Sequence, residues 1–120
     1  MHAPPFVVRS VNWNASRDKL RALRRTVFIE EQHVPEELEW DDADERAYHV
    51  LAVSEAGEPI GTGRLKPDGQ IGRMAVVRKW RRRGVGAAIL QVLLDLIDQF
   101  GFVRHIQQGD DVARCNQITV

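Results

Sequence analysis

The residues whose types and spacing could do chemistry are concentrated at positions 78–86, in the stretch RKWRRRGVG. Four arginines and a lysine fall within six residues, and two glycines follow them. Arginine supplies positive charge and paired N–H donors for phosphate oxygens, while glycine lets a ligand come close to the backbone. The stretch therefore predicts a site for a phosphate-bearing molecule, with a nucleic-acid patch, a targeting signal or a plain solvated connection as alternatives.

The elements on either side of this stretch favour the phosphate interpretation. Alternating apolar residues at 48–55, 59–66 and 71–77, separated by turn residues, predict three antiparallel strands. An amphipathic helix is then expected from Gly84 to Gly101, with an apolar stripe formed by Val85, Ile89, Val92, Leu93, Leu96, Ile97 and Phe100. A strand, a glycine loop and a helix N-terminus in this order bind phosphate, because the first N–H groups of a helix lack internal acceptors and carry partial positive charge.

The first third of the chain predicts one strand, one helix and a long acidic loop. Residues 6–13 read as the strand, and Asn14 or Ser16 is expected to cap the helix that follows. The helix should bury Leu20, Leu23, Val27 and Phe28 and turn its arginines to solvent. The acidic residues 30–45 show no clean period and are expected to form a loop with one helical turn, either solvated or lining a substrate site. Residues 102–107 predict a short final strand.

The length and composition restrict the class of protein. A chain of 120 residues fits a single domain over positions 1–120. Lys+Arg and Asp+Glu both number 17, which argues against a general nucleic-acid binder. Cys115 is the only cysteine, so neither a disulfide within the chain nor a cysteine metal cluster is possible, and we expect a cytoplasmic protein without a bound metal. We also expect no signal peptide and no membrane span.

Two common phosphate loops do not fit the stretch, and one family does. The P-loop pattern is absent, and a dinucleotide fingerprint would need a third glycine at Ile89. RRRGVG, at positions 81–86, resembles the R/Q-x-x-G-x-G/A pyrophosphate loop of the GCN5-related N-acetyltransferases (GNAT). GRMAVV before it resembles that family's fourth strand, and VFIEEQ followed by acidic residues and YHVLAV resembles its small bacterial ElaA-like members. The resemblance covers roughly residues 6–105.

This resemblance implies a fold, an activity and a set of cofactor contacts. The fold would be α/β, with a mixed, mostly antiparallel sheet flanked by helices. The activity would be transfer of an acetyl group from acetyl-CoA to an amine of a small molecule or a protein, by direct attack of the amine. Backbone groups of Met74, Ala75 and Val76 would bind the pantetheine arm, and the Val76 N–H could stabilise the oxyanion. The pyrophosphate would be held by Arg81, Arg82, Arg83, Gly84, Val85, Gly86 and Ala87.

The other chemical roles implied by the resemblance concern the acceptor amine. Direct attack needs a neutral amine, so a carboxylate or an ordered water must accept its proton. Glu31, at the family's EQ position, is the candidate for this base or for amine binding. The acidic Asp41, Asp42 and Asp44 could attract a cationic amine. His49 lies in a predicted strand and is expected to be structural, and Trp80 is expected to pack beside the glycine loop.

The C-terminal end departs from the family pattern. Members continue after the long helix with a strand, a helix and a final strand, and often carry a tyrosine that acts as general acid. The only tyrosine here is Tyr48, in a predicted strand. Three explanations stay open: a truncated sequence, a partner chain that completes the sheet in a homodimer, and a degenerate member that binds acyl-CoA without catalysis. An unpaired sheet edge favours the dimer.

Two further functions remain as alternatives. A small basic nucleic-acid-binding module would use the arginines differently and would show binding that depends strongly on salt. An acyl-homoserine-lactone synthase is a more distant possibility, suggested by a loose likeness of ELEWDDAD to the acidic signature of those enzymes. The sequence does not identify the acceptor amine.

Overall fold

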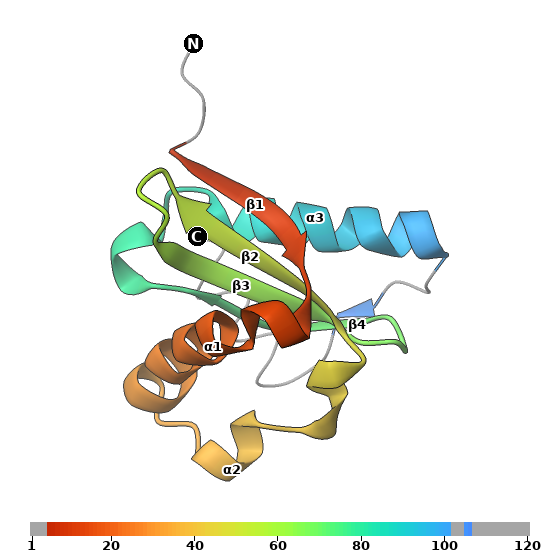
Figure 1. The fold of residues 1–120 in the computed structure, drawn as a ribbon, viewed down its shortest axis with the longest axis horizontal. Coiled ribbons are helices and arrows are strands. Elements are labelled where there is room, and N and C mark those ends of the chain that lie inside the picture. The colour runs from red at the N-terminus through yellow and green to blue at the C-terminus, as the bar shows by residue number, and fades with distance from the viewer. Residues whose placement is uncertain (1–4, 102–104, 107–120) are drawn as a thin grey trace.

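The computed structural model describes residues 5–101 and 105–106, which form one sheet with helices on both faces (Figure 1). The sheet has five strands in the order β1-β2-β3-β4-β5. The strands from β1 to β4 are antiparallel to one another in sequence, and β5 pairs with β4 in parallel. The strands are β1 (Phe6–Val11), β2 (Tyr48–Ser54), β3 (Pro59–Leu65), β4 (Gln70–Val76) and β5 (His105–Ile106). The predicted α/β class, the three-stranded meander and the mixed, mostly antiparallel sheet are confirmed.

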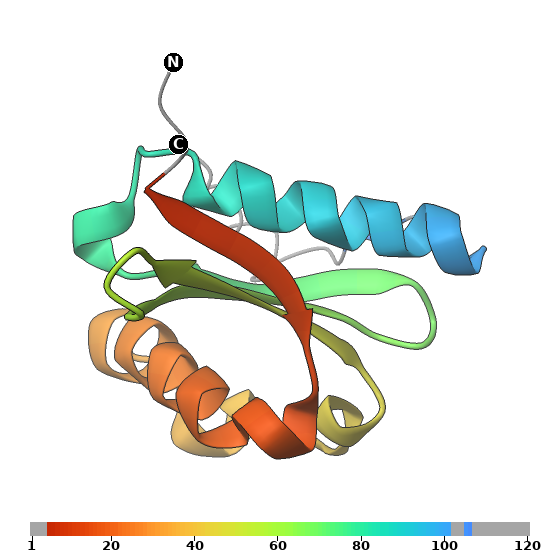
Figure 2. The ribbon, with the colours of Figure 1, turned by 45° about the horizontal axis from the view of Figure 1, so that its top comes forward.

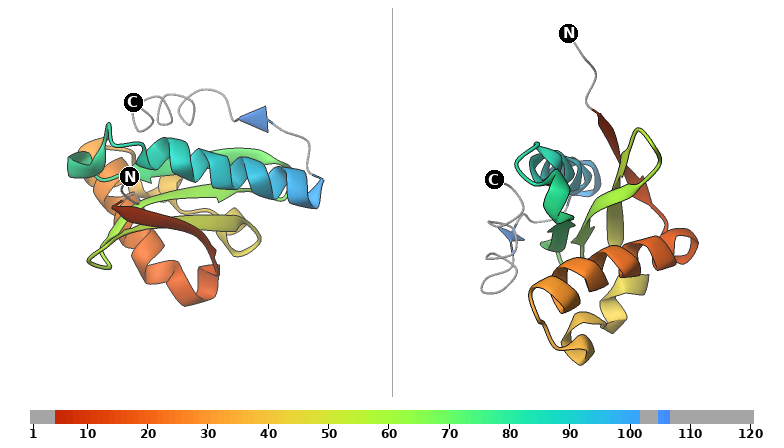
Figure 3. Two further views of the ribbon diagram at one scale, coloured as in Figure 1. Left: turned by 90° about the horizontal axis from the view of Figure 1, so that it is seen from above. Right: turned by 90° about the vertical axis from the view of Figure 1, so that its left-hand side faces the viewer.

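The helices divide between the two faces of the sheet (Figure 2). The long helix α3 covers one face, and α1 crosses the other face with α2 and η2 beside it (Figure 3). The helical segments are α1 (Trp13–Arg24), η1 (Arg25–Glu31), α2 (Glu36–Glu39), η2 (Asp42–Glu45), η3 (Arg78–Trp80) and α3 (Val85–Phe100). This arrangement gives the sheet two buried faces, which explains why β2, β3 and β4 are buried along most of their length.

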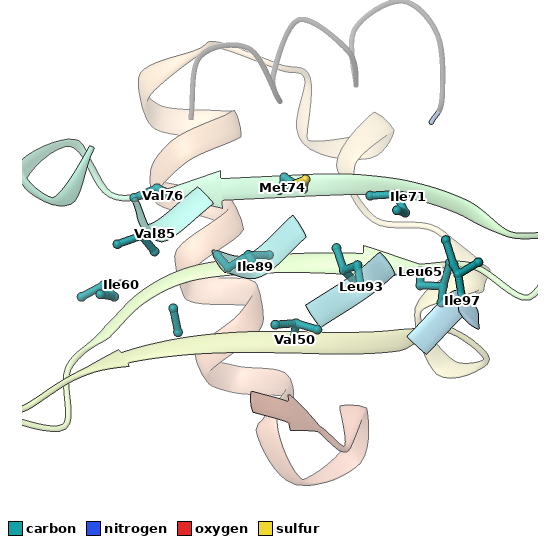
Figure 4. Packing of buried hydrophobic residues seen from close by; sticks show 11 residues of the cluster. Val50, Ile60, Leu65, Ile71, Met74, Val76, Val85, Ile89, Leu93 and Ile97 are labelled. Carbon is teal, nitrogen blue, oxygen red and sulfur yellow. The ribbon is translucent and has the colours of Figure 1, made fainter. Parts of the chain in front are cut away.

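The main core lies between α3 and the sheet (Figure 4). The helix buries a row of residues at i, i+4 spacing: Val85, Ile89, Leu93 and Ile97. They pack on the inward side chains of the sheet, namely Val50, Ala52, Ile60, Leu65, Ile71, Met74 and Val76. Each such aliphatic side chain contributes about 1.5–3 kcal/mol by leaving water. The predicted stripe is therefore confirmed at its centre, but Phe100 at its end is 48% exposed and stacks on Tyr48 instead.

Two glycines in β3 allow α3 to approach the sheet closely. A Cβ placed on Gly63 would lie 2.8 Å from Ile89 Cγ2 and 2.9 Å from Leu93 Cδ1. A Cβ on Gly61 would lie 2.9 Å from Ile89 Cδ1. These separations are shorter than van der Waals contact, so the helix sits where it does because β3 carries no side chain at these two positions.

The first helix begins earlier than the sequence predicted. Asn12, rather than Asn14 or Ser16, is the N-cap: its Oδ1 accepts a hydrogen bond from Ala15 N–H at 3.2 Å. Strand β1 consequently ends at Val11, and Trp13 belongs to the helix. The predicted cap residues were wrong because Asn12 and Asn14 are equally good capping side chains, and only the end of the strand decides between them.

The apolar face of α1 was predicted correctly, but its polar face was not. Leu20, Leu23, Val27 and Phe28 are all buried. Arg24, expected to face solvent with the other arginines, is only 1% exposed. The helix then continues beyond its α-helical part as a π-helix, η1, over Arg25–Glu31. This widened turn is of a kind that often occurs at functional sites.

Strand β4 is irregular at its centre. Arg64 of β3 pairs with Gly72, whereas Thr62 pairs with Ala75, so β4 carries one extra residue at this point. Arg73 adopts a left-handed backbone with φ 51°, which is a β-bulge. Strand β5 pairs with β4 at Gln70 and Ile71, before the bulge. A bulge bends its strand, so the last residues of β4 are turned away from the line of its first residues.

Candidate active site

The glycine loop connects β4 to α3 as the sequence predicted. Gly84 is the N-cap of α3 and has a left-handed backbone with φ 83°, a conformation that glycine adopts without strain. Ala88 N–H donates the first hydrogen bond of the helix, to Gly84 O at 3.0 Å. The N–H groups of Val85, Gly86 and Ala87 precede this bond, at the end of the helix where backbone donors have no internal acceptors. The loop thus offers a positively polarised helix N-terminus.

The arginines of the loop lie in different environments. Arg82 and Arg83 are exposed, and Arg82 also has a left-handed backbone with φ 64°. The Cζ atom of Arg83 lies 5.1 Å from the centroid of the Trp80 ring. A cation within about 6 Å of an aromatic ring centroid makes a cation–π contact. Arg81 is half-buried and points in another direction. The predicted packing of Trp80 beside the loop is confirmed, and two arginines remain at the surface next to the helix N-terminus.

Within the loop, exposure follows the helix geometry. Gly84 and Ala87 are exposed, while Val85 and Gly86 are buried under the start of α3. A Cβ added to Gly84 would meet no atom within 4 Å. Backbone groups near Gly84 are therefore open to a ligand, whereas Val85 contributes its side chain to the core.

The last residues of β4 present backbone groups on the outer side of the strand. Val77 N–H donates to Ile60 O of β3 at 3.0 Å. Since hydrogen-bonding direction alternates along an antiparallel strand, the N–H and C=O of Val76 point away from β3. The side chains are buried: Met74 and Val76 pack under α3, and Ala75 packs against Val27 and Phe28 on the other face. Any ligand at this strand would meet backbone, not side chains.

Arg81 joins the end of β4 to η1. Its Nε donates to Val76 O at 2.9 Å. Its Nη1 donates to Glu31 Oε2 at 2.8 Å, and its Nη2 donates to Glu31 Oε1. The guanidinium thus uses a donor on each of its three nitrogens, with Glu31 bound at two oxygens in the strongest geometry for such a pair.

Glu31 is consequently an ionised carboxylate whose two oxygens both accept hydrogen bonds from Arg81. Hydrogen bonds from Arg81 hold the pKa of this carboxyl below its ordinary value, although partial burial opposes the effect. Arg78, which is 80% exposed, adds a second cation through its Nη2 at 2.9 Å. A carboxylate with a lowered pKa is a weak proton acceptor. The structure places Glu31 next to the glycine loop, and its role as catalytic base stays a prediction.

An open cavity of about 280 Å³ borders this pair. Its lining consists of Thr26, Glu30 and Glu31 from η1 together with Arg78 from η3. Glu30 is exposed and lies next to Glu31 in the chain. The carboxylates of Glu30 and Glu31 therefore lie where η1 meets η3, which directly follows the end of β4.

The acidic segment is not the simple solvated loop that the sequence suggested. It contains α2 and η2, and its acidic side chains are largely paired with arginines. Asp44 is 4% exposed and accepts from both Arg24 and Arg64, at 2.8 and 3.0 Å. Asp41 accepts from Arg64 at 2.9 Å. Asp41 and Asp44 are therefore neutralised from within the protein. Of the three aspartates predicted to face a substrate, Asp42 is exposed and has no ion pair with any residue that the structure describes.

His49 is a structural histidine, as expected. It is 1% exposed and stacks on Trp13 with 4.8 Å between ring centroids. Its Nε2 lies 2.8 Å from Asp44 O, and since a carbonyl can only accept, Nε2 carries the proton. Burial lowers the pKa of the imidazole, which keeps the ring neutral near pH 7.

Two further properties bear on the kind of protein. Among residues 5–101 and 105–106, no three His, Cys, Asp or Glu side chains gather in a way that could hold a metal ion. Over the same residues, every helix is too short or too polar to cross a membrane. His2, Cys115 and most of the predicted strand at 102–107 lie outside the described residues, and of that strand only β5 is described.

Sequence reasoning placed the residues of the loop correctly but missed the contacts between distant charges. It did not pair Glu31 with Arg81, which are 50 positions apart, or Arg24 with Glu39 and Asp44. The sequence signal for these contacts was the separation of an acidic segment at 30–45 from a basic segment at 78–83. It indicated that oppositely charged side chains would pair across the fold, but not which residues would form each pair.

Comparison with known proteins shows to which family this site belongs. Residues 17–119 match the profile of the Acetyltransferase (GNAT) family. The chain is 30% identical over 112 residues to YyaT, an uncharacterized protein of Bacillus subtilis (strain 168), covering 88% of this chain and 75% of that one. A provisionally assigned N-acetyltransferase from Lactobacillus plantarum has a similar fold, with a TM-score of 0.75, 26% identity, and coverage of 88% and 76% of the two chains.

More distant structures share the fold alone. AAC(6')-Iy, solved with a bisubstrate analogue of CoA and acetylneamine, superimposes with a TM-score of 0.69 at 14% identity, covering 90% of this chain and 82% of that one. The match to the family profile, the similarity to YyaT and the fold show that the chain belongs to the GNAT family of acetyltransferases.

Proposed function

We propose that this protein transfers an acetyl group from acetyl-CoA to a primary amine of a small molecule or protein. The observation that carries the proposal is the N-terminus of α3: Gly84 in a left-handed conformation, open space around it, and Arg82 and Arg83 exposed beside it. A helix N-terminus with exposed backbone donors and two arginines suits the charge and oxygen atoms of a pyrophosphate. The residues proposed for this role are those predicted at 82–87, since the Arg81 N–H already donates to Arg78 O at 3.2 Å and its guanidinium binds Val76 O and Glu31.

The acyl end of the cofactor would lie along β4. The pantetheine arm has amide groups that can pair with the outward backbone groups of Met74 to Val76, as an added strand would. Val76 C=O already accepts from Arg81, so the Val76 N–H is the group left to bind the thioester oxygen. That N–H would stabilise the negative charge that develops on this oxygen as the amine attacks.

The reaction would proceed by direct attack within this geometry. The amine nitrogen forms a bond to the thioester carbonyl carbon, the C–S bond breaks, and CoA leaves as a thiolate that takes up a proton. The proton lost by the amine goes to a carboxylate or an ordered water. The cavity lined by Thr26, Glu30, Glu31 and Arg78 is the proposed acceptor site, and the exposed carboxylate of Glu30 favours a cationic amine. The analogue bound to AAC(6')-Iy joins CoA to an amine substrate, which supports the same order of groups here.

Turnover with a panel of amines tests the proposal. The purified chain is incubated with acetyl-CoA and, in turn, polyamines, aminosugars, amino acids and a lysine peptide, and free CoA thiol is measured against a protein-only blank that corrects for Cys115. Amine-dependent release of CoA, with the acetylated amine confirmed by mass spectrometry, is the expected result. Acetyl-CoA binding without turnover on any amine would instead support the alternative of a non-catalytic acyl-CoA-binding member.

Two companion predictions and one alternative remain with this proposal. A cytoplasmic location and a homodimer that completes the sheet are expected, and analytical ultracentrifugation checks the second. Nucleic-acid binding is the alternative use of the exposed arginines. Binding to duplex DNA that weakens steeply with salt, in the absence of acetyl-CoA binding, would favour that alternative.

A further inference from the structure

The geometry points to Glu31 and Arg81 as a positioning pair: Glu31 holds the Arg81 guanidinium against Val76 O, and so fixes the end of β4 where the thioester would react. This inference rests on the proposed function and assigns to both residues a role other than base or phosphate ligand. The pair connects η1, which lines the proposed acceptor cavity, to the loop that would bind the cofactor.

The first argument is the direction of the Arg81 side chain. Its three nitrogens donate to Val76 O and to both oxygens of Glu31, so three of its five N–H donors are used inside the protein. The side chain is 20% exposed and that of Glu31 18%. Arg81 therefore turns away from the exposed end of the loop, where Arg82 and Arg83 lie, and its charge is neutralised before any phosphate arrives.

The second argument is what the Arg81 contact does to β4. Val77 N–H is bound to Ile60 O on one side, and Val76 C=O, in the same peptide group, is bound by Arg81 on the other. This peptide group directly follows Val76 N–H, the proposed oxyanion donor. With both of its polar atoms held, the backbone at Val76 cannot rotate freely, and small errors in the placement of a reacting group lower rates strongly.

The third argument is that the arrangement is specific to arginine. Lysine carries a single ammonium on a flexible stem and cannot serve Val76 O and both Glu31 oxygens at once. Glutamine at position 81 could reach one partner but could not pair with a carboxylate bidentately. The pair should therefore behave as a unit, so that once one member is lost, removal of the other has little further effect.

The test combines a measurement on the free protein with kinetics. Arg81 Nε–H and the Val76 and Val77 amides are followed by NMR in the wild type and in Glu31→Gln, Arg81→Gln and the double variant. Glu36→Gln is the matched control. Like Glu31, Glu36 pairs with an arginine, but its partner is Arg25 and the pair is exposed and lies outside the cavity. We expect Glu31→Gln to speed solvent exchange at Arg81 Nε–H and to shift both amides, and Glu36→Gln to do neither.

The kinetic arm measures kcat, and the acetyl-CoA Kd, for the same variants. We expect kcat to fall by about 10- to 100-fold in Glu31→Gln and Arg81→Gln, with no further loss in the double variant and a much smaller change in acetyl-CoA Kd. A base role for Glu31 predicts instead that Glu31→Gln loses activity while Arg81→Gln, which leaves the carboxylate in place, largely keeps it, and this outcome would overturn the inference. Additive losses in the double variant would also overturn it. A wild type that binds no acetyl-CoA overturns the proposed function itself, and the positioning role falls with it whatever the NMR shows.

Discussion

Arg24 and Glu39 form an ion pair inside the protein, with Arg24 Nε donating to Glu39 Oε2 at 2.9 Å and side-chain exposures of 1% and 0%. Arg24 also donates to the main-chain oxygen of Glu39 at 2.9 Å and to Asp44 Oδ1 at 2.8 Å. Buried ion pairs thus hold the acidic segment against α1. The conformation of this segment depends on the pairing of each buried carboxylate, because an unpaired buried charge is strongly destabilising.

Loss of one member of this pair should destabilise the protein far more than loss of an exposed pair. We expect Glu39→Gln to lower the free energy of unfolding by about 3–5 kcal/mol, because it leaves excess positive charge buried around Arg24. Glu36→Gln, which breaks the exposed pair with Arg25, should cost less than about 1 kcal/mol. Urea unfolding followed by circular dichroism measures both, and equal losses would contradict the account.

The close approach of α3 to β3 gives a second prediction. Gly63→Ala should lower the free energy of unfolding by about 1–3 kcal/mol, because the new methyl group overlaps Ile89 Cγ2 and Leu93 Cδ1. Combined with Leu93→Ala, which removes one of these atoms, the losses should be less than additive. A double-mutant cycle by urea unfolding checks this, and strict additivity would show that the contact with Leu93 is not the cause.

Most of the architecture could be predicted from local patterns. Alternation over residues 48–77 identified the meander, and the row from Val85 to Ile97 identified the face of α3. The glycine loop could be placed because Gly84 and Gly86 follow a strand and open a helix. These features depend on periods of two and of three to four residues, which a single sequence displays directly.

Apart from the N-cap of α1, which is a local feature, the main errors concern contacts between residues far apart in the chain. Arg24 lies on the same helix face as Leu20 and Leu23, where a charged residue is not expected, and Glu39 and Asp44 neutralise it there. Glu31 and Arg81 meet because η1 ends beside the loop, and neither residue carries a local sign of the other. The bulge at Arg73 was missed for the same reason, since its neighbours continue a normal strand pattern.

The buried His49 predicts how stability depends on pH. Burial lowers the pKa of the folded-state imidazole below its ordinary value of 6.5, so the unfolded chain binds a proton more readily. Stability is therefore full above about pH 6.5 and falls as the pH drops below it. The free energy of unfolding should decrease between pH 7.5 and 5.5 in the wild type, by urea titration.

His49→Gln is the control for this slope, because its side-chain amide can still donate to Asp44 O. The other three histidines remain in both proteins, so their titration cancels in the comparison. We expect the variant to lose much less stability over the same pH range. Parallel slopes would contradict an assignment of the pH dependence to His49.

The Glu31–Arg81 pair predicts a shifted carboxyl titration. Arg81 lowers the pKa of the Glu31 carboxyl from the ordinary 4.5, so its contribution to stability is present above that value and is lost as the pH falls through the lower folded-state pKa. Carbon-13 NMR of the Glu31 carboxyl should give a midpoint below that of an unpaired glutamate, and Arg81→Gln should move the midpoint upward. A Glu31 midpoint at or above 4.5 in the wild type would show that the ion pair does not form in solution.

Calorimetric titration with acetyl-CoA tests the central claim most directly, using substitutions at two glycines that both have a left-handed φ. Gly84 and Gly57 have φ of 83° and 85°, and a Cβ at either would meet no atom within 4 Å, so Gly84→Asp and Gly57→Asp place the same charge in a similarly open, left-handed position. The account predicts micromolar binding by the wild type, retained in Gly57→Asp and lost in Gly84→Asp and Arg83→Glu. Equal loss in both glycine variants, or no binding by the folded wild type, would contradict the assignment of this loop to the cofactor.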